Sequence, residues 1–245
     1  MEEHELWFTA LLNDHLVGPA SALLNALGVH AHNPERPWVN FIAMEILVAV
    51  VILAVFAWLR RGLNVEKPGK AQHIFEGLYG FIEAQGDEVV GHGSHRYLAF
   101  CGTLFVFILF ANLIGIIPGF ESPTMFTPVP LGCALAAFIY YHIAGVQAQG
   151  LGKYLAHFAG PMPVLAPLMV PIELVSHSAR AMSLTIRLFA NMFAGEQVTL
   201  IFMSLVPVAI PAIFMGLHVF VSFLQAYIFM LLTMVYLQGA VAHDH

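Results

Sequence analysis

Charged side chains are scarce in this chain. Asp, Glu, Lys and Arg make up 10% of its 245 residues, whereas apolar residues make up 59%. A soluble domain carries about 25% charged residues, which cover its surface. A soluble fold of this length is therefore excluded, and the composition predicts an integral membrane protein that lies in a lipid bilayer.

Basic residues are fewer than acidic ones. Nine Lys and Arg against fifteen Asp and Glu give a formal net charge of -6 at pH 7. We expect no nucleic-acid partner, because binding to phosphates requires a basic surface. Residues 1–5 are acidic, so this stretch predicts neither a signal peptide nor an Arg-rich transit peptide.

Sequence motifs that carry chemistry are also missing. The two cysteines, Cys101 and Cys133, lie in apolar runs and predict no disulfide framework. The sequence contains no Walker, Gly-x-Gly-x-x-Gly, His-Glu-x-x-His or Cys-x-x-Cys pattern. We therefore expect no metal, no cofactor and no enzymatic activity in this chain itself.

Long apolar runs dominate what is present. A membrane-spanning helix needs about 20 apolar residues, and runs of this kind cover 41–59, 97–117 and 130–148. Residues 162–237 are almost continuously apolar. The pattern predicts an all-α integral membrane protein, one membrane domain over 1–245 with about five membrane-crossing helices. In it, 97–148 forms one helical hairpin and 162–237 a second, longer one.

Residues 72–95 follow a different pattern. Apolar side chains such as Ile74, Leu78 and Ile82 recur at helical spacing, with acidic residues between them. This pattern predicts an amphipathic helix along the cytoplasmic membrane interface, or one packed on a partner. An ordinary helix in a surface loop is the alternative.

The basic residues predict the orientation. Arg60, Arg61, Lys67 and Lys70 follow the first run, whereas the loop 118–128 has no basic residue. Cytoplasmic loops carry the excess of Lys and Arg. The N-terminal segment 1–40 is therefore expected outside the cytoplasm and the C-terminus inside it.

The polar residues of the last apolar region lie in one stripe. Residues 172–206 contain no proline, and one helix of that length would measure ~52 Å against a hydrocarbon core of ~30 Å. The helix must therefore tilt strongly, bend or leave the bilayer. Glu173, Arg180 and Arg187 are seven residues apart, so they share one face, and Ser183 and Asn191 lie on that face too.

Buried ionisable residues indicate an ion or substrate path by default, but each has a structural alternative. Glu173 could form a structural pair with His177 or Arg180. Arg187 could be a buried arginine satisfied by carbonyl groups or by Asn191.

A second polar stripe follows on the last helix. His218 and Gln225 are seven residues apart and share a face. A hairpin that turns at Pro207 would bring Glu196 level with His218, and Gln225 to within half a turn of Arg187. For His218 the alternative is a core histidine bonded to a backbone carbonyl.

Residues 183–196, Ser-Leu-Thr-Ile-Arg-Leu-Phe-Ala-Asn-Met-Phe-Ala-Gly-Glu, resemble the signature of subunit a of the F-type ATP synthase membrane sector. Residues 112–119 resemble the end of that family's second span, and 224–237 resemble its last helix. The similarity runs in order from about residue 40 to the end. It implies a proton-translocating stator with two offset aqueous half-channels, against which a ring of c subunits rotates during ATP synthesis.

The resemblance also implies roles for individual residues. Arg187 matches the essential arginine, the fixed coupling charge. The other matched positions are, in the outer half-channel, Glu196, His218 and Asn112; beside the arginine, Gln225; and toward the cytoplasmic half-channel, Ser183, Asn191, Tyr236 and Glu173. Two departures stand out, since Ala190 replaces a usual glycine and residues 125–128 replace asparagines common in the outer loop.

The implied partners are the c-subunit ring, the b subunits of the peripheral stalk and the remaining ATP synthase complex. The implied location is the inner membrane of a bacterium. A secondary cation or proton transporter is the first alternative, although the sequence shows no pair of related halves. A membrane redox enzyme is the second, with His142, His177 and His218 as the candidate haem ligands.

Overall fold

A computed structural model describes residues 6–18, 36–64, 66–91, 93–117, 119–154, 166–205 and 209–241. Within these ranges every regular element is a helix, which confirms the all-α prediction. The elements, in chain order, are α1 (Trp7–His15), α3 (Asn40–Arg61), α4 (Lys70–Val89), α5 (His95–Ile114), the short 3-10 helix η1 (Pro123–Met125), α6 (Pro128–Gln149), α8 (Ala166–Leu205) and α9 (Ala209–Val241).

Four helices in the described ranges are long and apolar enough to cross a membrane. They are α3, α5, α6 and the part of α9 from Ala212 to Val241. Helix α8 is not among them, although its 40 residues give a helix of about 60 Å. It differs from the others in the partly exposed charged residues spaced along it, which include Glu173, Arg180 and Arg187.

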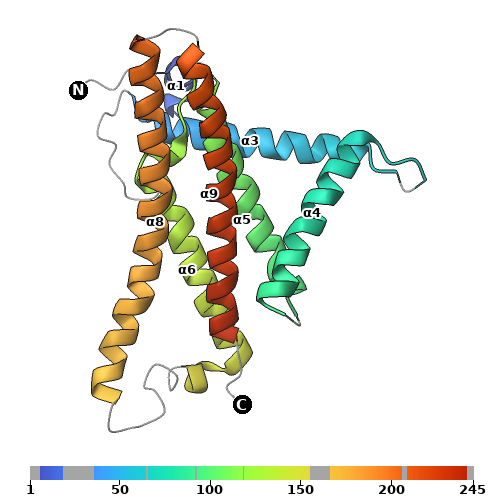
Figure 1. Cartoon of the computed structure of the whole chain (residues 1–245), viewed down its shortest axis with the longest axis vertical. Helices are drawn as coiled ribbons and strands as arrows, with labels where there is room; N and C mark the ends of the chain where they lie inside the picture. The colour runs from blue at the N-terminus through green and yellow to red at the C-terminus, as the bar shows by residue number, and fades with distance from the viewer. Residues whose placement is uncertain are drawn as a thin grey trace.

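The two longest helices form an antiparallel pair (Figure 1), and α5 and α6 pack against them. Helix α3 runs across the direction of this pair, and α4 returns from the far end of α3 toward α5. The 22 residues of α3 span about 33 Å, which matches the bilayer core. If α3 crosses the bilayer along its normal, α8 and α9 are strongly inclined to that normal. The turn expected at Pro207 lies outside the described residues.

Local sequence explains where several helices begin and end. Helix α6 begins at Pro128, whose fixed φ and missing N–H suit the first helical position. It ends before Gly150, which adopts a φ of 81°. Arg60 and Arg61 occupy the last turn of α3, where positive charge is favoured by the helix dipole.

Small residues let the central helices approach closely. Lipid removes the hydrophobic drive for helix association, so close packing has to replace it. A Cβ added to Gly145 of α6 would lie 2.5 Å from Cε2 of Tyr154 and 3.0 Å from the carbonyl oxygen of Ala240 in α9. Further small residues buried in this core include Ala134, Ala137, Ala144, Ala226 and Ala240.

Hydrogen bonds between side chains and neighbouring helices supplement this packing. Gln149 of α6 donates to the carbonyl of Ala240 at 3.0 Å, and the Tyr227 hydroxyl of α9 donates to Gln85 of α4 at 2.8 Å. Such bonds contribute about 0.6 kcal/mol each in membrane proteins. Helix α4 is thus attached to the bundle along its buried Ile82 side, and its position at the membrane interface stays a prediction.

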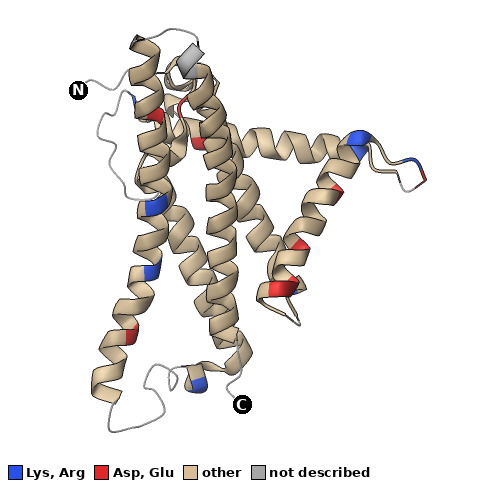
Figure 2. Cartoon of the chain, viewed as in Figure 1, with Lys and Arg blue, Asp and Glu red and all other residues tan. Residues whose placement is uncertain are grey.

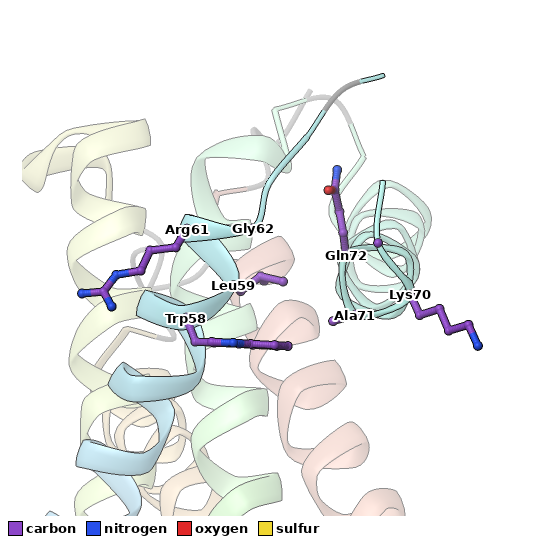
Figure 3. A pocket seen from close by; sticks show the side chains of 8 residues that line it. Trp58, Leu59, Arg61, Gly62, Lys70, Ala71 and Gln72 are labelled. Atoms are coloured by element: carbon purple, nitrogen blue, oxygen red, sulfur yellow. The ribbon is translucent and has the colours of Figure 1, made fainter. Parts of the chain in front are cut away.

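A cavity of about 450 Å³ lies where α3 ends and α4 begins (Figure 3). The charged ends of Arg61 and Lys70 point away from each other and from the space between the helices. Gln72 is already engaged, accepting from the backbone of Asn64 at 3.0 Å and donating to Glu76 at 2.7 Å. Among the described residues that line the cavity, Gln72 is therefore already hydrogen-bonded and the two charged groups point elsewhere.

Candidate functional site

Charged residues are spaced along α8 rather than gathered in one pocket (Figure 2). Glu173 lies near the first end of the helix, Arg180 and Arg187 follow, and Glu196 lies near the second end. The start of α8 lies at the same end of the molecule as the end of α9 (Figure 1). Helices α6 and α9 and the element η1 pack against different parts of α8 and of this charged stripe.

Arg187 lies on an open face of α8. Its side chain is partly exposed, and its Nη2 lies 3.5 Å from the Ser183 hydroxyl oxygen one turn away. The two residues line a shallow hollow with Ala179, Met182 and Ile186. In the described part of the chain Arg187 forms no ion pair. The alternative of an arginine satisfied by Asn191 is not what the structure has, because among the described residues the hydrogen bond of Arg187 goes to Ser183 and none is formed with Asn191.

Asn191 and Gln225 join α8 to α9 next to Arg187. The Asn191 amide donates to the Gln225 side-chain oxygen at 2.8 Å. Gln225 is 2% exposed, and its Nε2 is buried without a partner among the described residues. Hairpin geometry predicted Gln225 within half a turn of Arg187. In the structure Gln225 contacts Asn191, which lies one helical turn after Arg187. Two neutral amides thus lie beside the open arginine.

Asn112, near the C-terminal end of α5, is the centre of a buried polar cluster. It is fully buried, donates to the Ser222 carbonyl at 3.4 Å and accepts from the Thr124 hydroxyl at 2.6 Å. The Ser122 hydroxyl lies 2.7 Å from that of Thr124 and donates to the carbonyl of Ala111 at 2.9 Å. Element η1 therefore folds back onto α5, and it also packs against α3, α6 and α8.

Glu196 and His218 both reach this cluster. Glu196 lies against the backbone of Ser122, and His218 lies against the backbone of Asn112. His218 also approaches α8, because a Cβ on Gly195 would lie 3.2 Å from its Nδ1. Buried atoms Oε2 of Glu196 and Nε2 of His218 have no partner within the described ranges. Polar atoms of this kind are normally satisfied by protein or by ordered water.

Glu173 pairs with His177 rather than with Arg180. Oε1 of Glu173 lies 3.1 Å from Nε2 of His177, whose Nδ1 lies 2.8 Å from the hydroxyl of Tyr141 in α6. Arg180 instead lies over the ring of Tyr236, 5.3 Å from its centre. Of the two pairings open from sequence, the structure has the one with His177.

Several polar residues of these clusters could not be found from spacing alone. Ser122, Thr124 and Tyr141 lie in different elements from the residues they contact. The sequence signal for the first two was the run Ser-Pro-Thr in the outer loop, which also contains Glu121 and Thr127. Tyr141 lies within the apolar run 130–148, where no spacing pattern distinguishes it from residues that face lipid or the core.

Comparison with known proteins places these residues in one family. The family described as ATP synthase A chain matches residues 42–238. Proteins named ATP synthase subunit a are similar to the chain along nearly its whole length. That of Solibacter usitatus (strain Ellin6076) is 64% identical over 236 residues, 96% of this chain and 100% of that protein.

A second relative, from Koribacter versatilis (strain Ellin345), is 53% identical over 242 residues, 99% of each protein. A third, from Helicobacter pylori (strain P12), is 42% identical over 208 residues, 84% of this chain and 92% of that protein. The chain therefore belongs to the ATP synthase A chain family, the one that residues 183–196 resemble.

Proposed function

We propose that this chain is the stationary, non-catalytic subunit of an F-type ATP synthase that couples proton flow across the membrane to rotation of a c-subunit ring. Arg187 is its fixed coupling charge. The observation that carries this proposal is an arginine without an ion pair among the described residues, on an open face of α8, with a different polar cluster on each side of it along the helix.

The open face of α8 suits a helix of the ring. Small side chains flank the arginine at Ala179, Ser183, Ala190 and Ala194, and all four are exposed. Small residues allow the backbones of two membrane helices to approach closely. Large exposed apolar residues, such as Ile186, complete a surface that either lipid or an apolar partner would cover.

The chemistry of arginine fits the task. A carboxylate on the ring must be neutral when it faces lipid, because a bare charge there costs at least several kcal/mol. Opposite Arg187 its charged form is stabilised. Arginine stays protonated and does not hand its proton on, so it blocks a direct leak between the two half-channels. Lysine, which loses its proton when buried, would be a poorer choice.

The polar clusters supply the two half-channels of the proposal. Glu196, His218 and Asn112 belong to the outer one, with Ser122 and Thr124 as additional water-ordering hydroxyls. On the other side, Gln225, Asn191 and Ser183 lie near the arginine, and Tyr236 and Glu173 lie toward the cytoplasm. Each proton that crosses supplies about 2.3 kcal/mol per 100 mV of membrane potential.

The surroundings follow from the same proposal. We place the chain in a bacterial inner membrane, with the N-terminus outside and the C-terminus in the cytoplasm. The ring of c subunits contacts the Arg187 face, and the b subunits of the peripheral stalk hold the chain in place. Catalysis on phosphate belongs to other subunits of the complex.

The decisive experiment is proton-driven ATP synthesis in inverted membrane vesicles that carry Arg187→Ala, with the assembled complex quantified by immunoblot. We expect normal assembly and no synthesis. Arg96→Ala, at an exposed position of α5, is the control and should leave synthesis unchanged. Synthesis near the wild-type rate in Arg187→Ala would make the arginine structural and overturn the proposal.

A further inference from the structure

Beyond the half-channel positions, the structure joins α6 to α8 by a buried titratable group, His177. We propose that His177 is the proton-accepting group that loads and unloads Glu173 at the cytoplasmic end of the path, and that Tyr141 is the positioning residue that holds its ring. This inference rests on the proposed function. It adds to it a residue that the matched family positions leave out.

The geometry is that of a three-membered chain with a gradient of exposure. The side chain of Glu173 is 34% exposed, that of His177 is 9% exposed, and Tyr141 is 1% exposed. The contacts are 3.1 Å from the carboxylate to Nε2 and 2.8 Å from Nδ1 to the phenol oxygen. The histidine therefore connects a carboxylate that reaches solvent to the interior of the bundle.

Tyr141 decides which ring nitrogen exchanges the proton. The hydrogen bond at one nitrogen of a histidine sets the protonation of the other. When Nδ1–H donates to the phenol oxygen, the lone pair of Nε2 points at Glu173. The exchange site is then the nitrogen on the exposed side, and the ring does not need to turn over between cycles.

The step balances as a simple proton transfer. A proton from water of the half-channel is added at Nε2, which gives an imidazolium paired with the Glu173 carboxylate. The proton moves to the carboxylate, and the protonated Glu173 releases it to cytoplasmic water. One proton enters and one leaves, no electrons move, and both residues return to their starting state.

The groups around the ring come from four segments. From α6, Tyr141 and His142 face it, with the two imidazole centres 5.0 Å apart. From α8 come Glu173 and the fixed charge of Arg180, which lies over Tyr236 of α9. Among the described residues, a further titratable neighbour is Tyr154, which follows α6 and lies 6.0 Å from the His142 ring.

Tyr236 links this cluster to the interior. Its ring lies 6.0 Å from that of Tyr141 and directly under the Arg180 guanidinium. Tyr236 is one of the residues assigned to the cytoplasmic half-channel by the proposed function. Through Tyr141, the histidine therefore connects two positions of that half-channel, Tyr236 and the partly exposed Glu173.

The test uses the complete ATP synthase in inverted vesicles, whose outer medium bathes the cytoplasmic face. Rates are expressed per assembled complex. His177→Gln keeps hydrogen bonding but takes no proton, and His177→Ala removes the ring. We expect about a tenfold loss of proton-driven synthesis in both, below the roughly 10²–10⁴-fold typical of a lost acid–base group because water partly replaces it.

Rescue separates proton exchange from packing. Imidazole added to the medium should restore the rate of His177→Ala, whereas pyrazole, of the same size but not protonated near neutral pH, should not. His95→Gln is the matched control, because His95 also lies 3.1 Å from a partly exposed carboxylate, that of Glu83, but is itself exposed. It should retain the wild-type rate.

The outcomes are distinct. A normal rate in His177→Gln, or equal rescue by pyrazole and imidazole, would overturn the role of His177. If His177→Ala does not assemble, His177→Gln decides, together with Tyr141→Phe, which keeps the ring volume and should lower the rate severalfold. Arg187→Ala in the same vesicles tests the proposed function separately, because loss of synthesis there with a normal His177→Gln rejects only the histidine.

Discussion

At the scale of single residues, the two kinds of polar group in the chain differ in what they do with a proton. Glu196 and His218 can bind and release one, whereas the amides of Asn191 and Gln225 can only orient water or each other. The titratable groups lie toward the ends of the α8–α9 pair, and the amides lie beside the arginine. The amides beside Arg187 therefore cannot carry a proton past it.

The first prediction concerns the outer cluster. Glu196→Gln and His218→Ala should each slow proton-driven ATP synthesis without abolishing it, because water can take over part of the transfer. Initial rates in inverted vesicles, normalised to assembled complex, measure this effect. Rates near wild type in both single variants would remove the two residues from the proton path.

A second prediction concerns Thr124, whose hydroxyl donates to the buried Asn112 side-chain oxygen at 2.6 Å. Thr124→Val keeps the shape but leaves that oxygen without its donor, which costs about 1–3 kcal/mol. The melting temperature of the purified protein in detergent should fall by several degrees. Thr103→Val is the control, because Thr103 is exposed and its hydroxyl donates only within its own helix.

At the scale of helices, apolar runs were sufficient to locate the elements. Helices α3, α5 and α6 cover the stretches 41–59, 97–117 and 130–148 to within about three residues at each end, because the bilayer length fixes how long such a run must be. Hairpin geometry likewise predicted that His218 lies beside Glu196 of α8. In the structure His218 approaches α8 at Gly195, the residue before Glu196.

Contacts between distant helices could not be predicted in this way. The bond between Tyr141 and His177 depends on the register of α6 against α8, and the positions are 36 residues apart in sequence. The same holds for Asn112 and Thr124, which meet only because η1 folds back. Periodicity fixes the face of one helix, but packing of small residues sets the register between two.

The packing of α6 against α9 leads to a third prediction. Gly145→Ala should lower the melting temperature in detergent, because the new Cβ would meet Tyr154 at 2.5 Å and the Ala240 carbonyl at 3.0 Å. Overpacking of this kind costs about 1–3 kcal/mol. Gly132→Ala in the same helix has open space around it and should leave the melting temperature unchanged or raise it.

At the scale of the whole molecule, the proposed orientation makes a fourth prediction. Glu66 and Thr127 are both exposed, and they lie on opposite sides of the membrane if Arg60 and Arg61 face the cytoplasm. A membrane-impermeant thiol reagent should label Thr127→Cys in cells with a permeabilised outer membrane, and Glu66→Cys only in inverted vesicles.

The native cysteines, Cys101 and Cys133, are buried and serve as the internal blank. Labelling of both introduced cysteines from the same side would contradict the orientation, and with it the assignment of Glu196 to the outer half-channel. Labelling with the two sides reversed would instead exchange the two ends of the proposed path.

The spacing of charges along α8 has an electrical consequence. Glu173 and Glu196 lie about 21 Å and about 14 Å from Arg187 along the helix axis, several times the reach of one hydrogen bond. The chain alone therefore has two separate proton sites with no conducting link between them, and a proton crosses only when a moving carrier takes it from one site to the other. A cell that makes this chain in excess of its ring should therefore keep its membrane potential.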